Sequence, residues 1–347
     1  MKKKNNVIGG ELFAKMIRCG ASQLRLNVDE INSLNVFPVP DGDTGDNMRM
    51  TLESGLAALE NIDSDNLALV MRTLSHGMLL GARGNSGVIL SQFFAGMAKG
   101  LVNHTKADAK TMGDALMCGV EQAYAAVVTP KEGTILTVAR EAVEYAVKRL
   151  NDNSTIRMLF ADLVKEMNLS LKRTPELLPI LKEAGVIDSG GAGLFHIMNG
   201  FNLVLNGSEE KDNTASYTLP DKAQATKPVL DIDSFGTDSE LTYGYCTEFL
   251  LRLQTNKADP DAFDPNIIIS YLQGIGDSIV AFKTDSLVKV HVHTKTPEKV
   301  LEFCHQFGEF LTLKIENMSL HHTDSNETHE SQSEDVAKPK KIGSVAV

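Results

Sequence analysis

Two aspartates separated by a single glycine, Asp41 and Asp43, lie near the start of the chain on a loop that also holds two prolines. Two short carboxylates on a stiff loop can face one hard cation, and Mg²⁺ usually binds one or two carboxylates together with substrate phosphates. A plain Asp-Gly turn is the alternative interpretation. A calcium loop fits poorly, because its sixth position would be Asp46 rather than glycine and its twelfth Leu52 rather than glutamate.

A glycine-rich segment, Gly81-Ala82-Arg83-Gly84-Asn85-Ser86-Gly87, precedes an apolar helix predicted over residues 88–98. Glycines let the backbone approach a ligand closely, and the start of a helix presents unpaired amides to an anion. The spacing matches neither the Walker pattern nor G-x-G-x-x-G. The alternative is an ordinary helix start with Asn85 or Ser86 as N-cap.

A third set of residues lies in the second half of the chain, where Cys246 is followed by His291 and His293 on a predicted strand. Strand alternation places both histidines on one face, where two imidazoles and a thiolate can converge on zinc. Alternating polar residues that simply face water are the other interpretation, and His321 and His322 are candidates for a further ligand. The remaining histidines considered are predicted to be structural or solvated: His76, His104, His196 and His305.

The elements that must position these residues divide the chain into domains. Residues 1–207 have helical periodicity, with helices predicted over 115–128, 135–150, 155–170, from Pro175 to just before Gly185, and over 192–205. The glycine-rich segments 41–45, 81–87, 131–134 and 188–193 alternate with these helices, which predicts an all-α bundle whose loops gather at one end.

A polar linker is predicted over 208–228, and the next domain, over 229–322, combines strands at 249–253 and 288–292 with helices at 265–274 and 297–307. This indicates a small α/β or α+β domain. We expect 323–341 to be disordered and 342–347 to begin a truncated third domain. The predicted fold class is therefore multidomain, an all-α domain followed by a small α/β (α+β) domain.

The composition and net charge of the chain argue against some classes of function. The chain has 347 residues, a net charge of −11 and four widely spaced cysteines. The negative charge argues against binding nucleic acid or acidic membranes. No signal peptide and no long apolar run are present in the sequence, so we expect a cytoplasmic protein with reduced thiols and no membrane insertion.

Four motifs occur in order within the helical half: Asp-Gly-Asp-Thr-Gly-x-Asn-Met from Asp41, Gly-Ala-Arg-Gly-Asn-Ser-Gly from Gly81, Pro-x-Glu-Gly-Thr ending at Thr134, and Asp-Ser-Gly-Gly from Asp188. This resembles the nucleotide-binding subunit of dihydroxyacetone kinases. The chain looks most like the large, ATP-binding subunit of bacterial fatty acid kinase, because the motif that starts at Asn35 reads Asn-Val-Phe-Pro-Val-Pro-Asp-Gly-Asp-Thr-Gly.

The resemblance implies an eight-helix barrel that binds ATP or ADP with two Mg²⁺ ions, and a zinc site in the next domain. It implies transfer of the γ-phosphoryl group to a fatty acid carboxylate, giving an acyl phosphate for phospholipid synthesis. A separate fatty-acid-binding partner protein would present that fatty acid, and the kinase would be a homodimer.

The resemblance also assigns roles to residues of this chain. Asp41 and Asp43 become the catalytic magnesium ligands, and Arg83 is a candidate to support the transferring phosphoryl group, although a salt bridge at the helix start explains it equally well. The family's third metal aspartate corresponds to Val36, which leaves Asn35 and Asp46 as candidates. The nucleotide would contact Thr44, Gly45, Asn47, Met48, Gly84, Asn85, Ser86, Gly87, Thr134, Asp188, Ser189 and Gly190.

Two rival functions remain open. One is a dihydroxyacetone-type kinase that acts on a small polyol. The additional domain and the Pro-Val-Pro-Asp motif disfavour this function. The other is a non-catalytic scaffold that binds ATP and transfers nothing.

Overall fold

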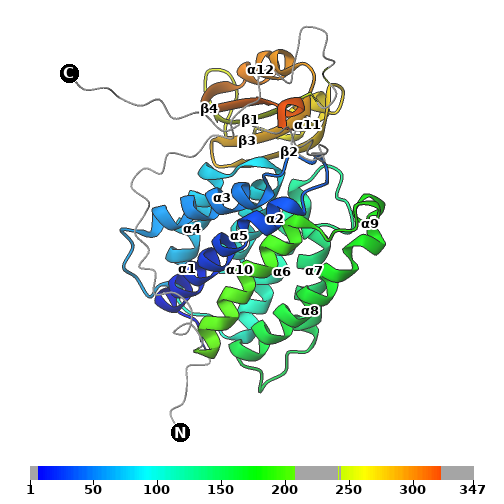
Figure 1. Cartoon of the computed structure of the whole chain (residues 1–347). Helices are drawn as coiled ribbons and strands as arrows, with labels where there is room; N and C mark the ends of the chain where they lie inside the picture. The colour runs from blue at the N-terminus through cyan, green and yellow to red at the C-terminus, as the bar shows by residue number, and fades with distance from the viewer. Residues whose placement is uncertain (1–6, 208–240, 242–243, 322–347) are drawn as a thin grey trace, which may run out of the picture.

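The structure is a computed structural model that describes residues 7–207, 241 and 244–321 (Figure 1). The linker predicted over 208–228, the polar segment over 323–341 and the strand over 342–347 lie outside the described residues. Within the described part of the chain, no helix is both long and apolar enough to cross a membrane.

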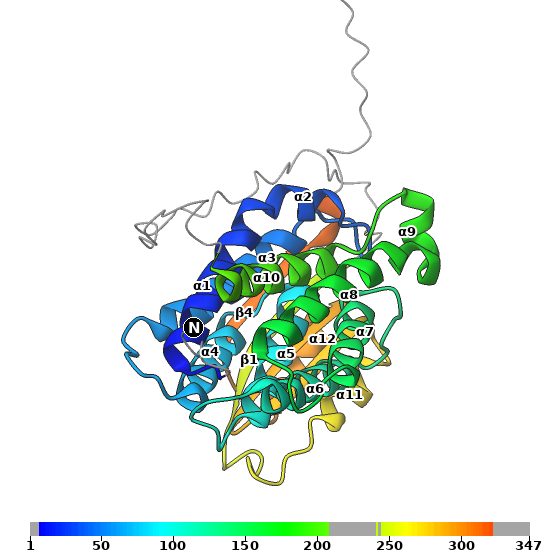
Figure 2. The ribbon, with the colours of Figure 1, turned by 90° about the horizontal axis from the view of Figure 1, so that it is seen from below.

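The first domain is built from helices. They are α1 Gly10–Leu26, α2 Val28–Ser33, α3 Thr44–Leu59, α4 Leu67–Gly81, α5 Gly84–Gly100, α6 Ala109–Ala126, α7 Ile135–Lys148, α8 Ile156–Leu177, α9 Pro179–Ala184 and α10 Ser189–Asn206. Neighbours pack in the order α1, α10, α8, α7, α6 and α5, and α5 contacts both α4 and α3 (Figure 2). The eight-helix barrel implied by the resemblance stays a prediction.

One shared apolar core holds these helices together. Helix α7 shows why, since it buries Ile135, Val138, Ala142 and Ala146 at spacings of three and four residues, which places them on one face. At the centre of the domain, the ring of Phe201 lies 5.7 Å from that of Phe13 and 5.9 Å from that of Phe160, measured between centroids.

The prediction that Pro175 begins a new helix is wrong, because Pro175 lies inside α8, which continues to Leu177. A proline removes the amide that would bond to the carbonyl four residues earlier. Here the Thr174 hydroxyl donates to that carbonyl, Leu171 O, at 2.7 Å. The helical conformation is interrupted only at Leu178, and α9 then starts with Pro179.

The second domain, called the middle domain below, is α+β. Its elements are β1 Tyr245–Leu253, α11 Asn266–Leu272, β2 Gly276–Thr284, β3 Leu287–Thr294, α12 Pro297–His305, β4 Gly308–Asn317 and the 3-10 helix η3 Met318–His321. The sheet has the order β2-β3-β1-β4, and each neighbouring pair is antiparallel. Strands β2 and β4 were not predicted from the sequence.

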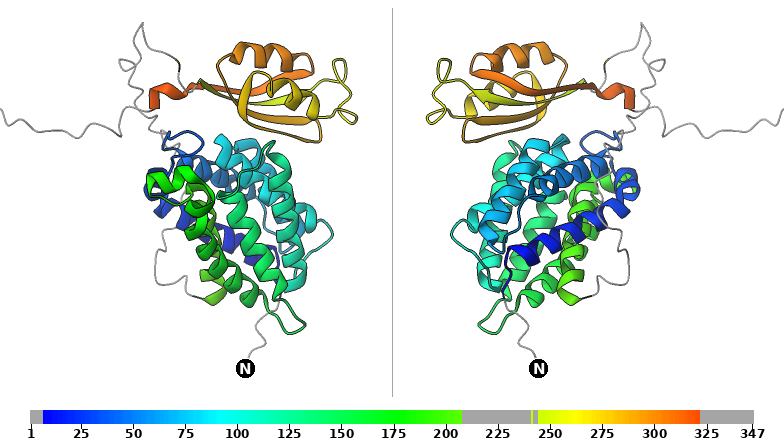
Figure 3. Two further views of the ribbon diagram at one scale, coloured as in Figure 1. Left: turned by 90° about the vertical axis from the view of Figure 1, so that its right-hand side faces the viewer. Right: turned by 90° about the vertical axis from the view of Figure 1, so that its left-hand side faces the viewer.

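The sheet separates two apolar layers. One face packs against α11 and α12, where Phe249, Val290 and Val300 are fully buried. The other face lies toward the helical domain (Figure 3). An apolar cluster joins the domains there, in which Val88 and Ala126 meet Val280 and Phe282 of β2. The middle domain therefore covers the end of the helical domain.

Candidate nucleotide and metal site

A cavity of about 700 Å³ lies between the two domains. The starts of four helices line it, namely α3, α5, α7 and α10, together with the loop that holds Asp41. Strands β1 to β4 supply the opposite wall. The glycine-rich segments therefore do converge, as their alternation with the helices predicted.

Asp41 and Asp43 both line this cavity. Burial and the neighbouring negative charge of Asp43 raise the pKa of Asp41 to about 8. Two carboxylates held together in partly buried surroundings repel each other unless a cation or a proton neutralises them. The donor set and its electrostatics therefore fit a divalent cation.

The two candidates for a third ligand lie in different places. Asn35 lines the cavity, and its Nδ2 donates to Asp41 Oδ1 at 3.2 Å, while its Oδ1 accepts from the Thr44 hydroxyl. Asp46 is bound away from the cavity, since its carboxylate pairs with Arg49 at 2.9 Å. Of the two, only Asn35 lines the cavity, and the group that it turns toward Asp41 is its amide nitrogen, which cannot bind a cation.

The residues predicted to hold phosphates lie at the start of α5. Gly84, Asn85 and Ser86 line the cavity, whereas the Gly87 amide already bonds to Arg83 O at 3.0 Å. The side-chain oxygen of Asn85 is buried and has no hydrogen-bond partner among the described residues. A buried polar atom without a partner is costly, and a bound ligand would satisfy it. The arrangement fits an anion at this helix start.

The other residues predicted to contact the nucleotide divide into those that line the cavity and those that do not. Asn47, Thr44, Ser189 and Gly190 line the cavity. Three more residues do not line it: Gly45, Met48, which is fully buried in the core, and Arg83, whose side chain is exposed.

Thr134 and Asp188 have a structural role that their position alone explains. Thr134 is the N-cap of α7 and accepts from Leu136 N at 3.4 Å, while Asp188 is the N-cap of α10 and accepts from Gly191 N at 2.6 Å. Burial raises the pKa of Asp188 to about 6. Both residues also line the cavity, so capping places them where a nucleotide could reach them.

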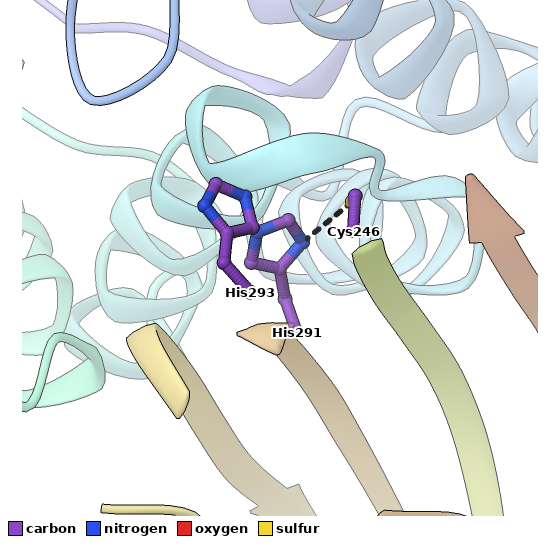
Figure 4. A group of neighbouring side chains, drawn as sticks. All are labelled: Cys246, His291 and His293. Atoms are coloured by element: carbon purple, nitrogen blue, oxygen red, sulfur yellow. Dashed lines mark hydrogen bonds between the residues drawn. The ribbon is translucent and has the colours of Figure 1, made fainter. Parts of the chain in front are cut away.

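The middle domain brings Cys246, His291 and His293 together, and their ligand atoms all lie within 4.8 Å of one another (Figure 4). Cys246 is opposite His293 in the β1–β3 register, and its Sγ lies 3.8 Å from His291 Nδ1. Burial, followed by the charge of His291, lowers the pKa of His293 to about 3, which keeps its imidazole neutral and able to bind metal. A thiolate and two imidazoles are a normal zinc ligand set.

Four functional candidates in the middle domain were missed from the sequence. Lys314 and Glu316 of β4 line the cavity and pair with each other at 2.7 Å. Glu248 and Lys289 are buried charges on the same face as Cys246 and the histidines. Strand alternation from Cys246 to Glu248, and from His291 back to Lys289, is the signal that could have found the latter two.

The two domains match known families. Residues 38–202 match the DAK2 domain, and residues 242–325 match the middle domain of FakA-like fatty acid kinase proteins. The chain thus carries a DAK2 domain. The match to the FakA-like middle domain follows it along the chain, and the resemblance drawn from the motifs is confirmed.

Similar proteins occur in Staphylococcus aureus. One from the bovine strain RF122 / ET3-1 and one from strain USA300, both named as uncharacterized proteins, are 42% identical to this chain over 335 residues. The alignment covers 96% of this chain but 59% of each relative, so the chain spans about three fifths of their length.

Two crystal structures of the dihydroxyacetone kinase from C. freundii are more distant matches. The complex with AMP-PNP and Mg²⁺ is 17% identical and the native form 20% identical. Each match covers 55% of this chain and about a third of the other, with a TM-score of 0.42.

Proposed function

We propose that the chain is the nucleotide-binding part of a magnesium-dependent acyl kinase. In this proposal it transfers the γ-phosphoryl group of ATP to a fatty acid carboxylate presented by a separate fatty-acid-binding protein. The observation that carries the proposal is the placement of Asp41 and Asp43 in one cavity with the starts of four helices. A phosphoryl-transfer site requires this combination of carboxylates for the metal and amides for the phosphates.

We assign the residue roles as part of this proposal, and their positions support the assignment. Asp41 and Asp43 would hold Mg²⁺, which when bound neutralises charge between the β- and γ-phosphates. The free amides at Asn85 and Ser86 and the Asn85 side chain would receive phosphate oxygens. Catalysis would consist mainly of holding the reactants in line and excluding water, because phosphoryl transfer needs little covalent chemistry from the protein.

We further propose that Cys246, His291 and His293 hold one Zn²⁺ ion. The closeness of the three ligand atoms supports this, and Cys246 is not part of a disulfide. Three protein ligands leave one position open in a tetrahedral site. Because these residues line the same cavity as Asp41, the acceptor would bind on the middle-domain wall.

The acceptor experiment separates this function from its rivals. The chain is supplied with Mg²⁺-ATP and one of three additions: oleate on a fatty-acid-binding protein, dihydroxyacetone, or no acceptor. ADP is measured, and acyl phosphate is trapped as the hydroxamate. We expect trapped acyl phosphate only in the reaction that contains oleate on its binding protein, and none in any reaction of the Asp43→Asn variant. ADP release that depends on dihydroxyacetone would favour the polyol kinase, and ATP binding without transfer to either acceptor would favour a scaffold.

The proposal also includes assembly as a homodimer. Sedimentation velocity over a range of concentrations measures the mass directly, and a single species of one chain at all concentrations would remove the homodimer from it.

A further inference from the structure

The segment that joins α4 to the first residue of α5, residues 82–84, is held by two side chains that reach across from the middle domain. Glu248 Oε2 accepts a hydrogen bond from the Gly84 amide at 3.2 Å. Lys289 Nζ donates to the Ala82 carbonyl at 2.9 Å. The two contacts therefore fix the backbone on both sides of Arg83.

Both of these charged side chains are almost fully buried, with an exposed fraction of 4% each. Burying a charge is costly unless it is paired and hydrogen-bonded. Glu248 on β1 and Lys289 on β3 attract each other electrostatically, and each uses a backbone group of the helical domain as its partner. Their burial thus depends on contact between the two domains.

Neither residue lines the cavity, so the inference concerns their contacts with the backbone of residues 82–84. Glu248 and Lys289 contact the backbone of residues 82–84, and the chain continues from there directly through the first turn of α5. On the helical side, the Arg83 amide donates to the hydroxyl of Thr51 at 3.2 Å. Three consecutive residues of this segment are therefore bonded to side chains.

Gly84 is the point where this arrangement meets the cavity. It has a φ of +57°, and a Cβ atom there would come within 2.4 Å of Asn47 Nδ2. Its successors Asn85 and Ser86 line the cavity. A small shift at Gly84 would therefore displace the amides that face the cavity. Fixing them in advance lowers the entropy cost of binding an anion.

We propose that Glu248 and Lys289 are positioning residues, which hold the start of α5 in the geometry that binds nucleotide phosphates when the middle domain is docked. The inference rests on the proposed function and extends it. Glu248 Oε2 also lies 3.7 Å from His291 Nδ1, so the same carboxylate contacts the candidate metal cluster and the phosphate segment. Through these two residues the middle domain would contribute to nucleotide binding although neither side chain lines the cavity.

The test uses the whole chain with Glu248→Gln, which keeps the size of the side chain, and Lys289→Met, which keeps its length. Hydrogen–deuterium exchange of the peptides covering residues 80–90 reports on the segment, and calorimetry reports on binding of Mg²⁺-ADP. We expect faster exchange at residues 82–88 in both variants, because Glu248→Gln replaces a charged acceptor with a neutral one and Lys289→Met removes the donor. The affinity for Mg²⁺-ADP should fall by about tenfold in Lys289→Met, the size expected for losing one hydrogen bond to a charged group, and by less in Glu248→Gln. Adenosine, which has no phosphates, should bind all proteins equally.

The matched control is Glu298→Gln on the exposed face of α12, which should behave as wild type. Zinc content and the thermal midpoint check that the variants stay folded. The loss of affinity in the double variant should be smaller than the product of the two single losses, because both residues hold one segment. Wild-type exchange at residues 82–88 in both single variants would overturn the inference, as would an equal loss of adenosine and Mg²⁺-ADP binding. Failure of the wild type to bind Mg²⁺-ADP would instead contradict the proposed function, and the exchange comparison would still test the segment.

Discussion

At the scale of single residues, the proposed function depends most on Asp41 and Asp43 as ligands for a divalent ion. Asp43→Asn and Asp41→Asn keep the size of the side chain but remove the attraction for a divalent ion. We expect each to lower phosphoryl transfer by about a hundredfold or more, since the metal neutralises charge on the transferred group. Ser86→Ala should cost about 1 kcal/mol of nucleotide binding, because the backbone amides remain. Calorimetry with and without Mg²⁺ separates the two kinds of effect, and magnesium-dependent binding with full turnover in Asp43→Asn would contradict the assignment.

The raised pKa of Asp41 gives a dependence of stability on pH. Its ordinary value is 3.8 and its folded value about 8, so the folded state holds the proton more tightly than the unfolded chain does. Without metal, this group therefore destabilises the fold increasingly as the pH rises from about 4 to 8. Asp41→Asn should remove that trend, and Mg²⁺ should reduce it in the wild type. Thermal midpoints between pH 5 and 8 check this, and identical pH profiles for the two proteins would rule it out.

The Cys246 cluster predicts about one zinc per chain, measured by elemental analysis. Burial raises the pKa of the Cys246 thiol, and the charge of Glu248 adds to the effect, so zinc binding must release its proton. Zinc affinity should then fall about tenfold for each unit of pH decrease below that pKa. The double variant Cys246→Ala/His291→Ala should contain no zinc, whereas Cys118→Ala in the helical domain should keep it. Zinc retained by the double variant would place the ion elsewhere.

At the scale of helices and strands, the cap residues separate structure from ligand binding. Asp188→Ala removes the acceptor for the Gly191 amide, and we expect a loss of about 1 kcal/mol in the free energy of unfolding. Asp188→Asn keeps an acceptor and should lose only a few tenths of that. Denaturant unfolding without nucleotide measures this effect. If both variants were as stable as the wild type but bound nucleotide weakly, Asp188 would be a ligand contact rather than a cap.

The same scale shows how far local patterns determine structure. Helix α7 was predicted within two residues because its apolar residues recur at helical spacing. Pro175 misled the prediction, because the hydroxyl of Thr174 bonds to the carbonyl that proline leaves unpaired, and no pattern rule contains that compensation. Strand β2 was missed because its continuous run from Ile279 to Phe282 lacks alternation. Both faces of that run are covered, one by the middle-domain core and one by the helical domain.

At the scale of the whole molecule, the sequence motifs identified both halves of the site but not that they share one cavity. Asp41 and Cys246 are about two hundred residues apart, and only the docking of the sheet on the helix starts brings their surroundings together. The same docking explains why Glu248 and Lys289 escaped notice, since a buried charge has meaning only when its partner on the other domain is known. Local spacing therefore predicts ligand sets, whereas the relation between them is a property of the interface.

The apolar cluster between the domains tests that relation. Phe282 is 7% exposed, belongs to this cluster and does not line the cavity. Phe282→Lys places a charge in the interface, and we expect the domains to separate, because an unpaired charge is costly to bury. The radius of gyration from small-angle scattering should rise, zinc content should be unchanged, and phosphoryl transfer should fall by about a hundredfold or more, since the cavity loses its acceptor wall.

The control for that variant is Ile267→Lys, at an α11 position that is 47% exposed and outside the interface cluster. It adds the same charge to the same domain and should change neither the scattering profile nor the activity. Full transfer by Phe282→Lys with clearly separated domains would show that the helical domain works without the middle-domain wall. An unchanged scattering profile together with lost zinc would instead mean that the substitution unfolds the sheet. Separation, retained zinc and lost transfer occurring together would show that the cavity between the domains, rather than either domain alone, is the functional unit.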